Sequence, residues 1–354
     1  MSPSNHAFLP AHSQSAKRVL LITYPRTASN LFIKMLALEN QPNVVSNESG
    51  GYFFWDAFMK ERKTVSRCRP IEQWSPEETV EIRQAFQRNF DYFEAMSQSA
   101  SYQGKIFFAK EHTMWLADPA AVAQYLSNHD CQASSRLSIQ VPNSYGAAGK
   151  FSPKNITIFP DAYLETWTLT FLIRHPALVF PSYYRALLDL EKEGFAEPDI
   201  IQPMLELHST LAWTRLLYDW YCEQVQSNPG QNNGICFPIL LDAQDVIHHP
   251  EIVLKYCELM DMSPERVKFT WQPEMSPHFV NGAVHKSPEA VMMATLNRST
   301  SLLKERTPDT VDITLERAKW EVEFGESLAK RMEKWVKDAM PDYNYLWTRR
   351  LRVI

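Results

Sequence analysis

Short apolar segments that alternate with helical patterns are the feature of this 354-residue sequence that most restricts its fold. Residues Arg18 to Tyr24 predict a buried strand and Ser29 to Glu39 a helix, so the chain opens with a strand, a turn and a helix. Further strands are predicted at Lys105 to His112, Trp167 to Pro176 and Ile235 to Asp242. Strands separated by helices favour a parallel sheet that helices cover on both faces.

Helix starts and one short strand complete this pattern. Pro176 opens the helix after the strand at 167–176. Ser75, with Glu78 three residues later, forms a capping box for a long amphipathic helix that runs to Met96. Val44 and Val45 predict a short second strand.

Other segments lack a regular pattern. The polar stretch 127–163 is longer than the roughly 15 residues at which a structureless loop becomes unusual, so we expect a mobile lid or a surface insertion there. Residues 271–312 are expected to be irregular and Ile313 to Met340 to form one long helix. Residues 1–16 predict a disordered lead-in, and 17–354 a single domain with this insertion and a C-terminal helical segment.

Net charge and the spacing of the cysteines restrict which partners the protein can bind. Acidic residues outnumber basic ones 41 to 36, which argues against a general nucleic-acid or anionic-membrane surface, so any anion site must be local. The five cysteines are scattered without CxxC spacing, and no run of about 18 apolar residues occurs. We expect a cytoplasmic protein with no metal, nucleic-acid or membrane partner. A homodimer contact or core packing explains the aromatic C-terminal helix equally well.

The turn after the first predicted strand, Tyr24 to Asn30, is suited to bind an anion. In a parallel sheet this turn and the following helix N-terminus present unpaired N–H groups and a positive dipole end. The pattern G-x-x-x-x-G-K-[ST] is absent, which disfavours ATP hydrolysis. The turn instead offers Arg26 with small polar neighbours, which suit a phosphate or sulfonate. A surface Arg26 with Thr27 and Ser29 as helix caps is an equally good explanation of the turn alone.

A second cluster supports the anion-binding interpretation. Arg174 ends a predicted strand, and Ser182 follows eight residues later, about two turns into the next helix. The two side chains could bind one anion together. For either residue taken singly, a structural ion pair or a helix surface position is the simpler interpretation.

Together these motifs resemble those of the PAPS-dependent sulfotransferases. Residues 24–30 are similar to the family's 5'-phosphosulfate loop, Tyr-Pro-Lys-Ser-Gly-Thr-Thr, and Arg174 with Ser182 resembles its 3'-phosphate motif at the same spacing. The segment 239–262 resembles the family's late strand-helix segment, and the resemblance covers roughly Arg18 to Thr270. It implies a three-layer α/β fold like that of the P-loop NTPases, with a central parallel sheet flanked by helices.

The resemblance also implies an activity and its residues. A sulfuryl group would move from PAPS, with PAP as product and no metal, to a hydroxyl or amine of a small-molecule acceptor. Lys110-Glu111-His112 is similar to the Lys-Thr-His pattern of cytosolic members, which implies His112 as catalytic base, Glu111 as the alternative base, and Lys110 with Arg26 as charge stabilisers. The implied donor-binding residues are Arg26, Thr27, Ala28, Ser29, Asn30, Arg174 and Ser182.

Several positions depart from the family pattern. Ala28 replaces a glycine, and its Cβ restricts how closely the backbone approaches an anion. Leu31 stands where cytosolic members have an adenine-stacking Trp, and Ala243 where they have Tyr. The C-terminal Arg-Lys-Gly motif is absent, and the candidates to replace it are His285, Lys286 and Arg298, for each of which a solvated basic face is the simpler interpretation.

The acceptor site is the least specified part of the sequence. An aromatic run at 50–58 could form the wall of a pocket, although ordinary core packing also explains it; the candidate contacts are Glu48, Tyr52, Phe53 and Trp55. Two rival functions stay open: a P-loop kinase or other phosphotransferase, and a non-catalytic protein that uses a nucleotide cleft to bind a partner.

Overall fold

The computed structural model describes residues 17–353 except for 49, 66–72, 123–135, 147–148, 228–237, 274–278, 281–282, 285–286, 303, 305–307 and 309. The predicted lead-in at 1–16 and the candidates His285 and Lys286 therefore lie outside the described residues, as does part of the predicted insertion.

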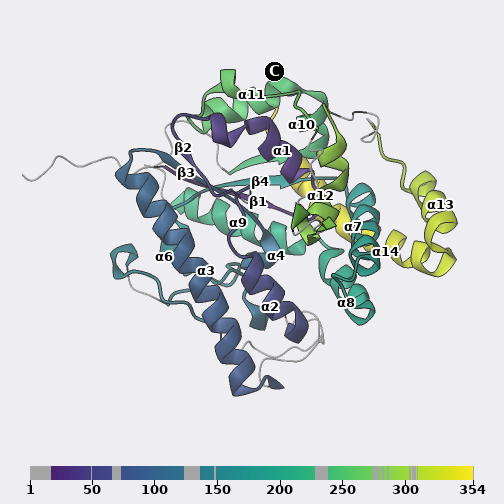
Figure 1. Ribbon diagram of the computed structural model, residues 1–354, viewed down its shortest axis with the longest axis horizontal. Helices are drawn as coiled ribbons and strands as arrows, with labels where there is room; N and C mark the ends of the chain where they lie inside the picture. The colour runs from purple at the N-terminus through teal and green to yellow at the C-terminus, as the bar shows by residue number, and fades with distance from the viewer. Residues whose placement is uncertain are drawn as a thin grey trace, which may run out of the picture.

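A five-stranded sheet forms the centre of the molecule (Figure 1). Its strand order is β2-β3-β1-β4-β5 and all its pairings are parallel, which confirms the predicted fold class, a three-layer α/β fold. The strands are β1 (Arg18–Thr23), β2 (Val44–Val45), β3 (Ile106–His112), β4 (Thr168–Ile173) and β5 (Ile239–Asp242). A separate antiparallel hairpin consists of β6 (Phe279–Val280) and β7 (Ala283–Val284).

Helices follow most of the strands. They are α1 (Ser29–Leu36), α2 (Trp55–Val65), α3 (Pro76–Tyr102), α4 (Thr113–Leu116), α6 (Asp161–Leu164), α7 (Pro176–Lys192), α8 (Pro198–His208), α9 (Ala212–Ser227), α10 (Ala243–His248), α11 (Pro250–Leu259), α12 (Pro288–Arg298), α13 (Ile313–Phe324) and α14 (Glu326–Trp347). As predicted, α3 begins at a capping box: the Ser75 hydroxyl accepts from the Glu78 N–H at 3.1 Å, and the Glu78 carboxylate accepts from the Ser75 N–H at 2.8 Å.

Alternation along β1 explains why helices cover both faces of the sheet. Val19 and Leu21 belong to the core that includes residues of α1 and α11, whereas Leu20 and Ile22 belong to the core that includes residues of α3 and α9. These four side chains are fully buried, and each contributes about 1.5–3 kcal/mol through removal of apolar surface from water. Figure 1 shows α1 and α11 on one side of the strands and α3 and α9 on the other.

The structure corrects two predictions in the C-terminal part. Residues 288–298, expected to be irregular, form α12, and the Ser287 hydroxyl caps it by accepting from the Ala290 N–H. The single helix expected at 313–340 is two helices, because Gly325 has φ 83° and ψ 160°, a conformation that breaks the helix. The second helix then continues to Trp347.

The described parts of the predicted insertion pack onto the core. Leu137, Ile158 and Phe159 are buried, and Ala117 forms a β-bridge with Thr157. Described residues 136–146 and 149–163 contribute nothing to the cavity described below. Within the described ranges, no helix has the length and apolar character needed to cross a membrane.

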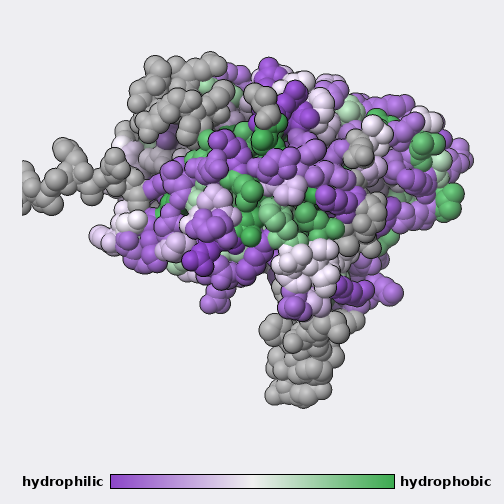
Figure 2. Space-filling model, turned by 90° about the horizontal axis from the view of Figure 1, so that it is seen from above, coloured by the Kyte–Doolittle hydropathy of each residue, from purple (hydrophilic) through white to green (hydrophobic). Residues whose placement is uncertain are grey.

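Seen from above, most of the visible surface is hydrophilic, with hydrophobic residues near its middle and at its right end (Figure 2). The right end of that view is where α13 lies in Figure 1. On this helix Trp320 is fully buried, whereas Leu315 and Val322 are exposed.

Candidate active site at the carboxyl ends of the strands

A cavity of about 700 Å³ lies where β1, β3 and β4 end. Because β1 lies between β3 and β4, the segments that follow these three strands meet at one edge of the sheet. The turn before α1, His112 at the end of β3, and Arg174 just after β4 all line the cavity. Residues of α7, α10, α12 and α13 also line it, and α12 packs against both α1 and α7.

The turn before α1 adopts left-handed conformations without glycine. Arg26 has φ 69° and Ala28 has φ 63°, and Ala28 is the residue that precedes the first turn of α1. The Thr27 hydroxyl and N–H both donate to the Tyr24 carbonyl, at 2.8 and 3.3 Å, which closes the turn. Thr27 is therefore buried and absent from the cavity lining, whereas Arg26, Ala28, Ser29 and Asn30 line it.

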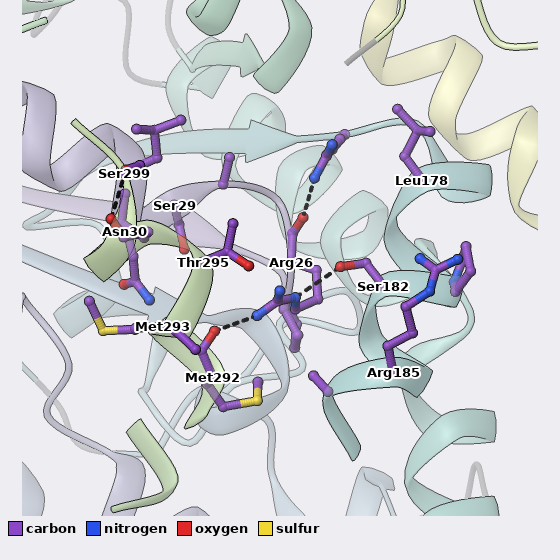
Figure 3. A pocket seen from close by; sticks show the side chains of 18 of the residues that line it. Arg26, Ser29, Asn30, Leu178, Ser182, Arg185, Met292, Met293, Thr295 and Ser299 are labelled. Atoms are coloured by element: carbon purple, nitrogen blue, oxygen red, sulfur yellow. Dashed lines mark hydrogen bonds between the residues drawn. The ribbon is translucent and has the colours of Figure 1, made fainter. Parts of the chain in front are cut away.

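Two guanidinium groups face this cavity. Arg26 Nε donates to Ser182 Oγ at 3.0 Å and Nη1 to the Met292 carbonyl at 2.7 Å, so that Arg26 lies between α7 and α12 (Figure 3). Arg174 Nη1 donates to the Arg26 carbonyl at 3.2 Å. Burial lowers the pKa of both groups, that of Arg174 to about 10 with a further contribution from the Arg26 charge, so both stay cationic at neutral pH.

The contact between Arg26 and Ser182 changes the expected arrangement. The family resemblance assigns Arg26 and Ser182 to opposite ends of the nucleotide, yet the two side chains are hydrogen-bonded. The predicted binding residues therefore form one continuous cationic wall, and two like charges in a partly desolvated cavity favour an anion there.

His112 is held by hydrogen bonds at both ring nitrogens. Its Nδ1 lies 2.7 Å from Thr23 Oγ1, and its Nε2 lies 3.0 Å from the Tyr52 hydroxyl. The hydroxyl hydrogen of Thr23 is donated to the Glu111 carbonyl at 3.0 Å, so Thr23 accepts from Nδ1–H and Nε2 carries a lone pair. Burial lowers the pKa of His112 well below 6.5, which keeps the ring neutral.

Lys110 and Glu111 are fully buried and do not line the cavity. Lys110 Nζ donates to Asn30 Oδ1 and lies 3.8 Å from the centre of the Tyr52 ring, and burial lowers its pKa to about 7. Glu111 Oε1 accepts from the N–H groups of Phe53 and Phe54, and burial raises its pKa to about 8. Side chains alternate along a strand, so Glu111 points away from the face that carries Lys110 and His112.

The remaining candidates are mostly outside the cavity. Of the four predicted acceptor contacts only Tyr52 lines it; Phe53 packs in the core against Phe93, Trp55 packs against Trp115, and Glu48 is exposed. Arg298 is exposed at the end of α12 and does not line the cavity either.

Sequence reasoning missed three parts of the site. The Met292 carbonyl contacts Arg26, and no residue pattern indicates such a backbone contact. The Ser287-Pro288 pair is a helix-start signal that could have revealed α12. Thr23, the last residue of β1, pairs in register with His112, which a correct alignment of the two strand ends would have suggested.

Two curated relatives agree with the sequence motifs. No family model matches the chain. Two curated proteins, each named sulfotransferase ppzF, are 36% identical to it over 348 and 346 residues: one from Metarhizium majus (strain ARSEF 297), the other from Metarhizium rileyi (strain RCEF 4871). Each alignment covers 97% of this chain and 99% of the relative. A solved sulfotransferase domain from the curacin biosynthetic pathway aligns with 91% of this chain and 98% of its own, at 10% identity and a TM-score of 0.37.

Proposed function

This chain belongs to the sulfotransferase family, and from that premise we propose that it transfers a sulfuryl group from PAPS to a hydroxyl or amine of a small-molecule acceptor. One observation carries the proposal: the guanidinium groups of Arg26 and Arg174 lie half-buried beside the same cavity, at the carboxyl ends of parallel strands.

The residues around the cavity fit an anionic nucleotide. Arg26 and Arg174 supply positive charge that burial makes costly without an anion. The N-terminus of α1 adds N–H groups, and Ser29 and Ser182 add hydroxyl donors. Leu31 and Ile247 also line the cavity, and their aliphatic side chains could pack against a purine ring in place of an aromatic side chain.

Each side chain then has a distinct task. Arg174 and Ser182 would bind the 3'-phosphate, and Ser29 and Asn30 would bind the end that carries the sulfuryl group. Arg26, which is hydrogen-bonded to Ser182, would lie between these two ends. Lys110 would act through Asn30, to which it donates, and would orient that amide toward the cavity. When bound, PAPS supplies the sulfuryl group; His112, neutral and with a lone pair at Nε2 that the Tyr52 hydroxyl contacts, is the base for the acceptor proton.

Binding of PAP tests the proposal directly. We expect PAP to raise the melting temperature and to bind in calorimetry, since a ligand stabilises the state that it binds. Arg174→Gln should weaken PAP binding by roughly 10- to 100-fold, as expected when a hydrogen bond to a charged group worth about 1.5–3 kcal/mol is lost. Arg331→Gln, on the exposed side of α14, is the matched control and should bind PAP as the wild type does.

Other outcomes favour the rival functions. Stabilisation by Mg-ATP without stabilisation by PAP would indicate a phosphotransferase. Stabilisation by neither nucleotide would favour a non-catalytic protein and would overturn the sulfotransferase proposal.

A homodimer stays a prediction. Leu315 and Val322 of α13 are exposed apolar side chains that a second copy could cover. Sedimentation of the wild type and of a Val322→Asp variant at several concentrations would test it, and a concentration-independent monomer mass would contradict it.

A further inference from the structure

The lone pair at His112 Nε2 does not face open space in the cavity. The Tyr52 hydroxyl lies 3.0 Å from it and, on the assigned tautomer, donates its hydrogen to it. An acceptor that enters the cavity therefore meets the Tyr52 oxygen, or must push that hydroxyl aside before it reaches His112.

The backbone around Tyr52 is held on both sides, which opposes its displacement. The Gly51 carbonyl accepts from the Lys110 N–H at 2.9 Å, and the Asn47 side chain accepts from the Gly51 N–H at 2.8 Å and donates to the Tyr52 carbonyl. A Cβ on Gly51 would lie only 2.8 Å from the Lys110 nitrogen, so this approach to β3 requires glycine. Glu111 holds the next two N–H groups.

The Tyr52 ring is held as firmly as its backbone. Lys110 Nζ lies 3.8 Å from the ring centre, the Trp115 ring centre is 4.7 Å away, and the His112 ring meets it edge-on at 5.1 Å. On the cavity side the Tyr52 hydroxyl lies 3.4 Å from Ser29 Oγ. The phenol oxygen thus lies between the candidate base and the first residue of α1.

We propose that Tyr52 is a catalytic residue that relays the acceptor proton to His112, so that the Tyr52 oxygen and not the imidazole contacts the acceptor. This inference rests on the sulfotransferase proposal and deepens it. It assigns the acceptor's reacting hydroxyl or amine to a position beside Tyr52 and Ser29.

The relay balances at every atom. As the acceptor oxygen or nitrogen bonds to sulfur, the bond between sulfur and the phosphate oxygen breaks, and PAP leaves with that electron pair. The acceptor proton moves to Tyr52 Oη while the original Tyr52 hydrogen moves to His112 Nε2. His112 becomes an imidazolium whose Nδ1–H stays bonded to Thr23, and the same path later returns the proton to water.

Burial raises the pKa of Tyr52, so a free phenolate is not a stable intermediate in this cavity. The two proton transfers must therefore occur together, with the phenol neutral before and after the step. The concerted transfer of two protons distinguishes this relay from the direct transfer of one proton to His112.

The test compares Tyr52→Phe with Tyr221→Phe. Both remove one phenol hydroxyl; that of Tyr221 donates to the Trp167 carbonyl at 3.0 Å, away from the cavity. Turnover is measured as sulfate and PAP released from PAPS with water as the acceptor, and PAP affinity by calorimetry. Nitrogen-15 NMR of the His112 ring reports its tautomer and the hydrogen bond at Nε2 without turnover.

We expect Tyr52→Phe to lower turnover roughly 100-fold or more, the range for loss of a proton-transfer group, with PAP affinity unchanged within about threefold. The Nε2 resonance should shift in this variant while Nδ1 stays protonated. In H2O–D2O mixtures the wild-type rate should depend quadratically on deuterium content. His112→Ala should lower turnover as much as His112→Ala combined with Tyr52→Phe, because the two groups act as one unit.

Two kinds of result separate the possible failures. The relay alone is overturned if the wild type binds PAP and consumes PAPS while Tyr52→Phe turns over PAPS at a similar rate. The same holds if Tyr52→Phe lowers turnover and PAP affinity by the same factor. A wild type that neither binds PAP nor consumes PAPS overturns the proposed function, and the relay with it.

Discussion

Ala28 and Arg26 have positive φ angles although neither is glycine. For an L-residue this conformation costs about 1–2 kcal/mol, and such strain is concentrated at functional sites. Here it turns the chain sharply enough to present both the Arg26 side chain and the start of α1 to one cavity.

Ala28→Gly should therefore stabilise the fold, by up to about 1 kcal/mol, since the relief of strain exceeds the added flexibility of the unfolded chain. PAP affinity should stay equal or increase, because the backbone can approach the anion more closely. Urea unfolding and calorimetry measure the two effects. Ala37→Gly changes another left-handed alanine outside the cavity and should leave PAP affinity unchanged. A PAP affinity that Ala28→Gly lowers and Ala37→Gly does not would contradict the prediction.

Glu111 gives a pH-dependent prediction. Its pKa is 4.5 in the unfolded reference and about 8 in the fold, because burial disfavours the carboxylate. Between these values the folded protein keeps a proton that the unfolded chain has released, so this contribution to the free energy of unfolding is lost as pH rises. Glu111→Gln keeps an acceptor for Phe53 and Phe54 and cannot ionise.

We expect the stability of Glu111→Gln relative to the wild type to increase as pH rises from about 5 to about 8. Urea titrations of both proteins across this range measure the difference. A difference that stays constant with pH would show that Glu111 titrates normally in the fold.

At the scale of elements, the sheet was predictable, whereas only the Ser287-Pro288 helix start pointed to α12. The strands are short buried apolar segments, so their composition alone indicates them. β1, β3 and β4 end at Thr23, His112 and Ile173, whereas the predicted segments end at Tyr24, His112 and Pro176. No side chain of α12 is fully buried, so no apolar stripe marks it as a helix. Its contact with Arg26 uses a backbone carbonyl, which every residue possesses.

The aromatic segment before α2 shows a second limit of sequence reasoning. Alternation along β3 predicts that Lys110 and His112 share a face and that Glu111 points away. Nothing in the sequence shows that residues 51–54 fold back onto the end of β3, where Glu111 holds two of their N–H groups. Tyr52 was therefore predicted only as a pocket wall, and its contact with His112 is visible only in three dimensions.

At the scale of the whole molecule, we predict one cooperative unfolding unit. The strands β1 to β5 form one sheet, and α14 packs against α7, α9, β4 and β5, which ties the C-terminal helices to the centre. Calorimetry should give one transition, and PAP at about 100 times its Kd should raise the free energy of unfolding by about 2.7 kcal/mol as a single shift. Two transitions, of which PAP moves only one, would contradict a single domain.

Because β1 lies between β3 and β4, the site consists of two parts that follow different strands. The residues that we propose to handle the acceptor proton, Tyr52 and His112, come from the β3 side, and Arg174 and Ser182 come from the β4 side. Substitutions in the acceptor part could therefore change the acceptor specificity while the nucleotide part stays the same. Related proteins with different acceptors should accordingly diverge around 50–58 and 110–115 while their nucleotide contacts drift slowly.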